Sequence, residues 1–186
     1  FTSVRSMQAK LKSLIEVGRI AKIKNGLYAT VNPLTGDVFA SRFEIASALF
    51  ENACLAYHSA LEFHGLGNQM FSEVQVFTEK RNIPFEYNGL EYKFFSYTAN
   101  CGIMRLEQNA EIVVTDLERT VVDCIDRIDL AGGLEELVTA LNGITHLDEQ
   151  ALLSYLKEYN KKFVYKKAGF LLSLLKKDLL SQNFFD

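Results

Sequence analysis

The sequence predicts an α+β fold divided between a small N-terminal unit, residues 1–37, and a larger unit, residues 38–186. Apolar residues recur at helical spacing near both ends of the chain, whereas short alternating runs fill the middle. Two Asn-Gly pairs, at 25–26 and 88–89, lie between such runs and are typical of β-hairpin turns. With 186 residues, 48% hydrophobic and 23% charged, the composition is that of a globular protein with a substantial core.

The first forty residues predict one helix followed by a two-stranded ribbon. Thr2 or Ser3 can cap the helix, and its apolar residues gather on one side: Val4, Met7, Leu11, Leu14 and Ile15. Gly18 ends it. Residues 19–24 and 27–31 then alternate as strands, joined at Asn25-Gly26 by a predicted type I′ turn with positive φ at both positions.

Basic residues mark this unit as a candidate DNA contact. Arg5, Ser6, Lys10 and Lys12 lie opposite the apolar side of the helix, while Lys22 and Lys24 are expected to share the solvent face of one strand, beside Asn25. A helix followed by a basic ribbon is the order of a winged helix-turn-helix, whose helix enters the major groove and whose wing lies along the phosphates. The helices that normally come first are absent, and the sequence begins with Phe1, so we expect a clipped N-terminus. The alternative is a helix and hairpin with a solvated basic face.

Charge divides along the chain in the same way. Residues 1–36 carry a net charge of +5, residues 37–149 carry −12, and residues 150–186 carry +4. A basic head on an acidic body predicts two units with different partners. The lysine-rich C-terminal end is a second candidate surface for an anionic partner, although a solvated helix face accounts for it more simply.

The larger unit reads as a mainly antiparallel sheet with helices. Helices are expected over 41–50, 58–64, 117–127, 134–141, 149–159 and 166–180, and strands over 73–78, 85–94 with a turn at 88–89, 94–97, 103–106 and 111–115. Thr115 or Asp116 is the candidate N-cap of the helix at 117–127, and Asp148 that of the helix at 149–159. The last helix is expected to turn Phe170, Leu171, Leu174 and Leu175 inward.

Two clusters invite a metal interpretation, and spacing argues against each. His58 and Glu62 are one turn apart, but His64 lies about 240° around the helix from His58. Asp116, Glu118 and Asp123 could clamp the metal of a nuclease-like enzyme, yet on a regular helix they do not converge. N-capping and ion pairs such as Arg119–Asp123 account for them better.

Three segments resemble a known family. The segment from Leu11 to Tyr28 is similar to the N-terminal winged helix of AbiEi-type antitoxins. The family's "SALxxHGL" segment resembles residues 58–66, which read His58-Ser59-Ala60-Leu61-Glu62-Phe63-His64-Gly65-Leu66. Its "xxERTxxD" segment resembles the residues from Asp116 to Cys124. The resemblance implies a DNA-binding autorepressor paired with a nucleotidyltransferase-like toxin. It implies a structural role for His58, Ser59, His64, Glu118, Arg119 and Asp123, with Arg119 tying its helix to the sheet.

The expected function is therefore a DNA-binding transcriptional regulator, acting on its own promoter as a monomer or homodimer, with no cofactor and no metal. Reversing the charges of Lys22 and Lys24 together should weaken DNA binding and flatten its salt dependence. The odd, unpaired set of Cys54, Cys101 and Cys124 fits reduced thiols in the cytoplasm, and no run is long enough to cross a membrane. A metal-dependent nuclease and an interaction module without DNA binding remain the alternatives.

Overall fold

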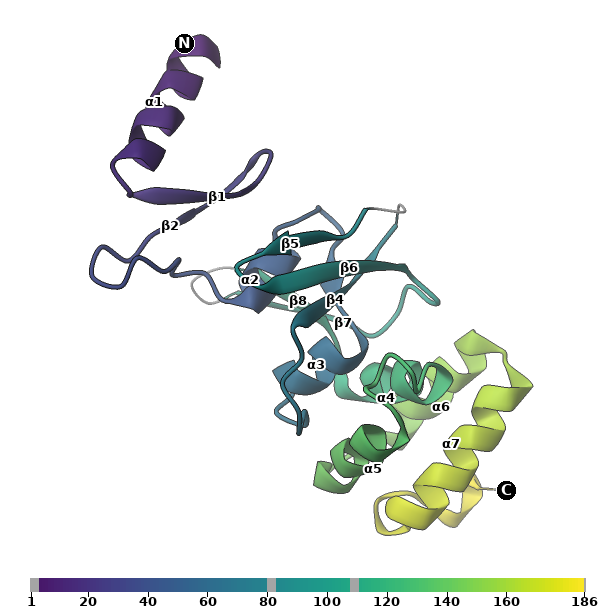
Figure 1. Cartoon of the computed structure of the whole chain (residues 1–186). Helices are drawn as coiled ribbons and strands as arrows, with labels where there is room; N and C mark the ends of the chain where they lie inside the picture. Colours follow the sequence, from purple (N-terminus) through teal and green to yellow (C-terminus); the bar gives the residue numbers. More distant parts are fainter. Residues whose placement is uncertain (1–3, 80–82, 108–110, 186) are drawn as a thin grey trace.

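The computed structural model describes residues 4–79, 83–107 and 111–185, and it has the predicted α+β fold. The predicted N-cap at Thr2 or Ser3 lies outside the described residues. Figure 1 shows an N-terminal helix and hairpin at one end, a sheet in the middle, and a group of helices at the other end. Among the described residues, no helix combines the length and apolar content needed to cross a bilayer.

The N-terminal unit consists of α1 (Val4–Glu16), β1 (Ile20–Lys24) and β2 (Leu27–Thr30), with β1 and β2 antiparallel. The turn differs from the prediction, because Gly26 has a positive φ of 85° and Asn25 does not. The pairing also shifts register between Lys22 and Lys24. This is the pattern of a hairpin with a bulge beside its turn rather than a regular type I′ hairpin.

The body is built on one six-stranded sheet in the order β5-β6-β4-β3-β8-β7. Its strands are β3 (Cys54–Leu55), β4 (Glu73–Thr78), β5 (Phe85–Tyr87), β6 (Leu90–Ser96), β7 (Ile103–Glu107) and β8 (Glu111–Thr115). The pairs β3–β4, β5–β6 and β7–β8 are antiparallel, whereas β3–β8 and β4–β6 are parallel. The antiparallel pairs include the predicted hairpin at Asn88-Gly89, where both residues have positive φ as a type I′ turn requires.

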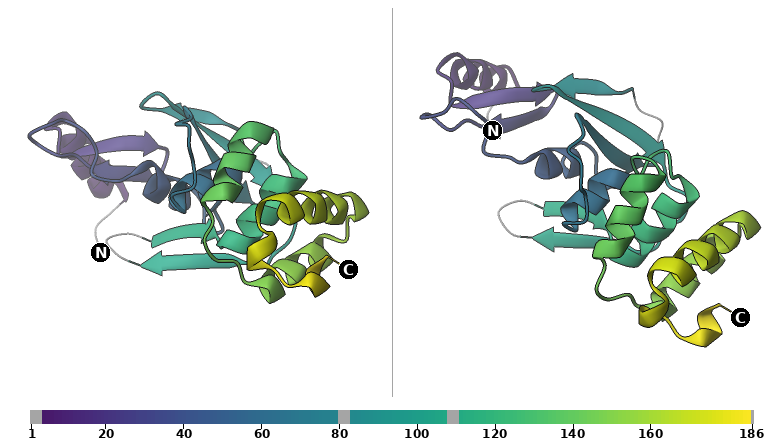
Figure 2. Two further views of the ribbon diagram at one scale, coloured as in Figure 1. Left: turned by 90° about the horizontal axis from the view of Figure 1, so that it is seen from below. Right: turned by 60° about the horizontal axis from the view of Figure 1, so that its bottom comes forward.

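Helices cover the two faces of the sheet. α2 (Arg42–Ser47) begins with a capping box formed by Ser41 and Glu44 and packs on one face. The rest of the helices are α3 (Tyr57–Phe63), α4 (Leu117–Asp126), α5 (Leu134–Gly143), α6 (Glu149–Tyr159) and α7 (Lys162–Leu175), followed by two short 3-10 turns, η1 (Lys177–Leu179) and η2 (Gln182–Phe184). Figure 2 shows these helices gathered on the side away from α1.

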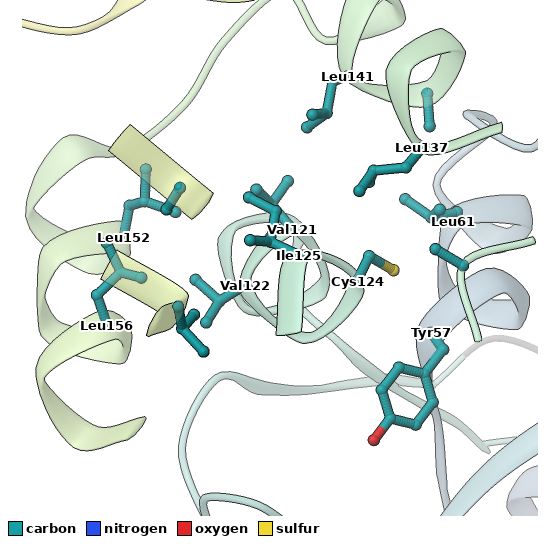
Figure 3. Close-up of a cluster of buried hydrophobic side chains, with 14 of the residues drawn as sticks. Tyr57, Leu61, Val121, Val122, Cys124, Ile125, Leu137, Leu141, Leu152 and Leu156 are labelled. Atoms are coloured by element: carbon teal, nitrogen blue, oxygen red, sulfur yellow. The ribbon is translucent and has the colours of Figure 1, made fainter. Parts of the chain in front are cut away.

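Strand alternation divides the core into two clusters. Neighbouring residues such as Cys54 and Leu55, or Val113 and Val114, belong to different clusters because successive strand residues face opposite sides of the sheet. The larger cluster surrounds α4, whose Val121, Val122, Cys124 and Ile125 contact the neighbouring helices (Figure 3). The smaller one holds α2, the other face of the sheet, and Ile23 of the hairpin.

The last helix differs from the prediction in its start and in its buried face. It begins at Lys162, four residues earlier than expected, and ends at Leu175. Leu171 is buried as predicted, but Phe170 and Leu174 are each 65% exposed, and their places are taken by Val164, Ala168 and Leu172. The apolar residues of this helix cover more than one side, so periodicity alone does not select the packed face.

Candidate nucleic-acid interface

The basic residues of α1 are exposed as the sequence predicts. Arg5, Lys10 and Lys12 are exposed, and Ser6 lies exposed on the same helix. Lys12 is within 3.8 Å of the Glu16 carboxylate, one turn away, in a fully solvated pair. No residue of α1 is buried. The predicted apolar side is therefore also open, with Val4 and Met7 exposed and only Leu11 and Leu14 half-buried.

The two lysines of β1 do not share a face, which corrects the sequence prediction. Lys22 is exposed, and so is Asn25 at the turn. Lys24 is turned toward the body: its Nζ lies 3.8 Å from the centroid of the Phe50 ring and 5.7 Å from that of Phe85. The bulge between the lysines breaks the two-residue alternation on which the prediction rested. Burial lowers the pKa of Lys24.

One further basic residue joins this surface. Arg19 is exposed between α1 and β1, and its carbonyl accepts a hydrogen bond from the Val31 amide at 3.0 Å. Sequence reasoning placed Arg19 in the strand but not among the DNA contacts. The signal was its position directly after Gly18, where the chain turns from the helix into the wing. The exposed basic set is thus Arg5, Lys10, Lys12, Arg19 and Lys22.

The three residues of the first body motif each join separate elements. His58 Nε2 donates to Glu136 of α5 at 3.2 Å, and Ser59 Oγ accepts from the Gln75 amide of β4 at 2.9 Å. His64 Nε2 donates to the Thr115 carbonyl at 2.8 Å, and Gly65 follows with φ of 73°, so the predicted helix end is confirmed. These contacts hold α3 against the sheet and against α5.

Glu136 is the partner that sequence reasoning missed. It is buried, and its Oε1 also accepts hydrogen bonds from the Asn68 and Gln69 amides at 2.6 and 3.1 Å. Burial works to raise the pKa of Glu136, but these amides and His58 outweigh it and hold the pKa below its ordinary value. The local sequence carries no signal for this role, because Glu136 looks like any acidic residue in the first turn of a helix.

The second body motif centres on the buried side chain of Arg119. The Asp116 side chain caps α4 by accepting from the Arg119 amide at 2.8 Å, as predicted. The Arg119 guanidinium is fully buried; its Nε donates to Asp123 at 3.0 Å, and its Nη1 donates to the carbonyls of Ala99 and Cys101 at 2.9 and 2.8 Å. Arg119 therefore ties α4 to the connection between β6 and β7.

Tyr159, on α6, completes this network. Its hydroxyl donates to Asp123 and also lies 3.1 Å from Arg119 Nε. The sequence predicts Arg119 and Asp123 as an ion pair along the helix; the structure shows that this pair is buried and that Tyr159 of α6 contacts it. Tyr159 follows Leu152 and Leu156 at helical spacing, which is the signal that could have placed it inward. Burial raises the pKa of Asp123 to about 7, against the pull of Arg119.

The candidate nuclease carboxylates are engaged separately. Asp116 Oδ2 accepts from Tyr155 at 2.5 Å, Glu118 Oε1 accepts from the Asp148 amide at 2.7 Å, and Asp123 faces Arg119. Within residues 4–79, 83–107 and 111–185, no group of three His, Cys, Asp or Glu side chains is placed to hold a metal ion. The structure therefore does not bring these three carboxylates into one site.

Fold and surface together define an α+β protein in which a helix and hairpin carry exposed basic side chains beside an acidic body. No family model matches the sequence, and no curated protein does. Among solved structures, the crystal structure of the RV2827C protein from Mycobacterium tuberculosis is similar, with a TM-score of 0.60 and 13% identity. The match covers 89% of this chain and 64% of that one, so this chain spans less than two thirds of its neighbour's length. At this identity, the likeness is one of fold.

Proposed function

We propose that the protein is a DNA-binding transcriptional regulator that acts on its own promoter. The observation that supports this most directly is α1 followed by the β1–β2 hairpin, with Arg5, Lys10 and Lys22 exposed. That order is the order of a recognition helix and a wing. Lysine and arginine contacts to phosphates supply affinity, and side chains of the helix that reach base edges select the sequence.

The body sets limits on how DNA can be bound. Residues 37–149 carry a net charge of −12, so a duplex meets attraction at the N-terminal unit and repulsion from this acidic part of the body. A single small contact gives little sequence discrimination. Two copies of the protein on adjacent half-sites would double the number of base pairs that are contacted. We propose that the protein acts in the cytoplasm and binds DNA as a monomer that pairs on its operator or as a homodimer.

The test is the salt dependence of binding to a duplex from the region upstream of its own gene, measured by fluorescence anisotropy between 50 and 200 mM salt. We expect Lys22→Gln to weaken binding and to lower the slope of log K against log salt by about 0.9, since one phosphate contact is lost. The matched control is Lys157→Gln, which removes the same charge from an exposed position on α6. Equal slopes for the two variants, or no binding by the wild-type protein, would contradict the proposal.

The antitoxin role is the narrower part of the proposal. It is supported by the resemblance of the segments around His58 and Arg119 to AbiEi-type antitoxins, and it predicts a nucleotidyltransferase-like toxin in the neighbouring reading frame. If that toxin arrests growth when expressed alone, co-expression of this protein should restore growth. Growth arrest that persists in the presence of this protein would remove the antitoxin role and leave the regulator.

A further inference from the structure

The tip of the hairpin is fastened to the body at two adjacent residues. Ile23 is 7% exposed and belongs to the core cluster that contains Ile45 of α2 and Tyr92 of β6. Lys24, the next residue, places its ammonium 3.8 Å from the centroid of the Phe50 ring. The tip therefore has one apolar and one cationic anchor on the body, and Lys24 also lies 5.7 Å from the ring centroid of Phe85 in β5.

The aromatic surface under Lys24 is itself well ordered by packing. Phe50 meets Phe94 edge to face, with centroids 5.4 Å apart, and Phe85 stacks on Tyr92 at 4.9 Å. These rings come from the segment after α2 and from β5 and β6. Their positions therefore depend on how these strands are arranged in the sheet. A lysine over the faces of two such rings is attracted by their electron-rich surfaces.

The remainder of the hairpin is only partly packed: Leu27 and Ala29 of β2 are half-buried against the same core cluster. A cavity of about 380 Å³ separates it from α2, with Ile20 and Tyr28 on the hairpin side and Ala40 and Ala48 on the other. The tilt of this ribbon is therefore set by the contacts at its tip together with the packing of Leu27 and Ala29. The exposed Lys22 lies two residues from that contact, so its position depends on the same anchor.

We propose that Lys24 is a positioning residue for DNA binding: held on Phe50 and Phe85, it sets the tilt of the hairpin and so the place at which Lys22 meets a phosphate. This inference rests on the proposed function and adds that the body controls the wing. Lys24 itself makes no phosphate contact. The bulge in β1 gives the two lysines these different tasks.

The first experiment measures the contact without DNA, in a double-mutant cycle of Lys24→Met and Phe50→Leu. Both changes keep apolar bulk and remove the cation or the ring. Urea unfolding of the four proteins should give a coupling of about two- to fivefold in the unfolding equilibrium constant. Hydrogen exchange of the β1 and β2 amides should quicken in each single variant. Strict additivity with unchanged exchange would overturn the proposed anchor.

The second experiment measures DNA binding by the same variants as a function of salt. Lys24→Met and Phe50→Leu should each weaken binding by about two- to tenfold at an unchanged salt slope, and Lys24→Arg should restore it, since arginine also binds aromatic faces. Lys22→Met should lower the slope by about 0.9. If Lys24→Met lowers the slope as Lys22→Met does while Phe50→Leu binds normally, Lys24 is a phosphate contact and the proposal fails. If the wild-type protein binds no DNA, the proposed function and the positioning role fail together, while the coupling measured without DNA still reports the contact.

Discussion

Arg119 and Asp123 are spaced like a surface ion pair, four residues apart on a helix, yet they are 0% and 1% exposed. Removing two charges from water is costly, and the attraction between them compensates only when the remaining hydrogen-bonding atoms also find partners. Here the carbonyls of Ala99 and Cys101 and the hydroxyl of Tyr159 provide several of these. The pair therefore links α4, α6 and the β6–β7 connection.

At pH 8, we expect Asp123→Ala to lower the free energy of unfolding by about 3–5 kcal/mol, because it leaves a guanidinium buried without its carboxylate. Glu111→Ala is the matched control: it breaks the Arg105–Glu111 pair, whose side chains are about half exposed, and should cost less than about 1 kcal/mol. Urea unfolding measures both. Similar losses of unfolding free energy in the two variants would show that the buried pair contributes no more to stability than the exposed pair.

Asp123 also predicts a pH dependence of stability. Its pKa is about 7 in the folded protein and 3.8 as an ordinary aspartate, so the folded state holds the proton more tightly than the unfolded chain. Stability from this group is then fully present below about pH 4 and is lost as the pH rises toward 7. The unfolding free energy of the wild-type protein should fall relative to that of Asp123→Asn across this range, in urea titrations at steps of one pH unit. A constant or growing difference would contradict the raised pKa.

At the scale of the elements, α7 shows how a buried face is selected. Two lysines donate to carbonyls at the ends of other helices: Lys167 of α7 to Ile125 and Asp126 of α4, and Lys176, the C-cap of α7, to Asn142 and Ile144 at the end of α5. Such carbonyls lack helical partners and carry partial negative charge. These contacts accompany a rotation of α7 that buries Leu172 and leaves Phe170 exposed.

The rotation of α7 can be tested by truncating one residue on each side. Leu172→Ala should lower the free energy of unfolding by about 2–5 kcal/mol, because it removes a fully buried side chain and leaves a cavity. Phe170→Ala, at a position 65% exposed, should cost less than about 1 kcal/mol although it removes more atoms. Chemical denaturation measures the free energy of unfolding of both variants. A larger loss of stability for Phe170→Ala than for Leu172→Ala would support the buried face predicted from the sequence instead.

At the scale of the whole molecule, the N-terminal hairpin and the body share a core. Ile23 packs in the same cluster as α2 and one face of the sheet, across the boundary that composition places at residue 37. The charge does change sign at that boundary. The change separates a basic surface from an acidic one, but the two units still share a hydrophobic core cluster. The N-terminal hairpin is therefore packed against the sheet through a shared core cluster.

This linkage predicts cooperative unfolding. Ile23→Ala should lower the stability of the whole described fold by about 2–4 kcal/mol while unfolding remains a single transition. Far-ultraviolet circular dichroism and tyrosine fluorescence should give coincident curves. Two separate transitions, of which only one responds to the substitution, would mean that the hairpin and the body unfold independently.

Much of the fold follows from local signals. Asp116 and Asp148 cap their helices as predicted, and the strand at residues 73–78 and the turn at Asn88-Gly89 are confirmed, because caps, alternation and turn residues act within a few positions of the chain. The candidate site was predicted only in part. The basic residues of α1 and Lys22 are exposed as expected, whereas the direction of Lys24 depended on a bulge that its local sequence does not reveal.

The sequence by itself determined the α+β class, the ends of several helices and the division into a basic head and an acidic body, since these depend on residue type and spacing. Tertiary structure alone decided that Arg119 and Asp123 are buried, that Glu136 accepts a hydrogen bond from His58, and that the Lys24 ammonium lies over the Phe50 ring. The physical reason is that the cost of removing a polar group from water, and the partner that offsets it, are set by elements distant in the chain. Short-range preferences choose the elements, and packing chooses which of their faces meet.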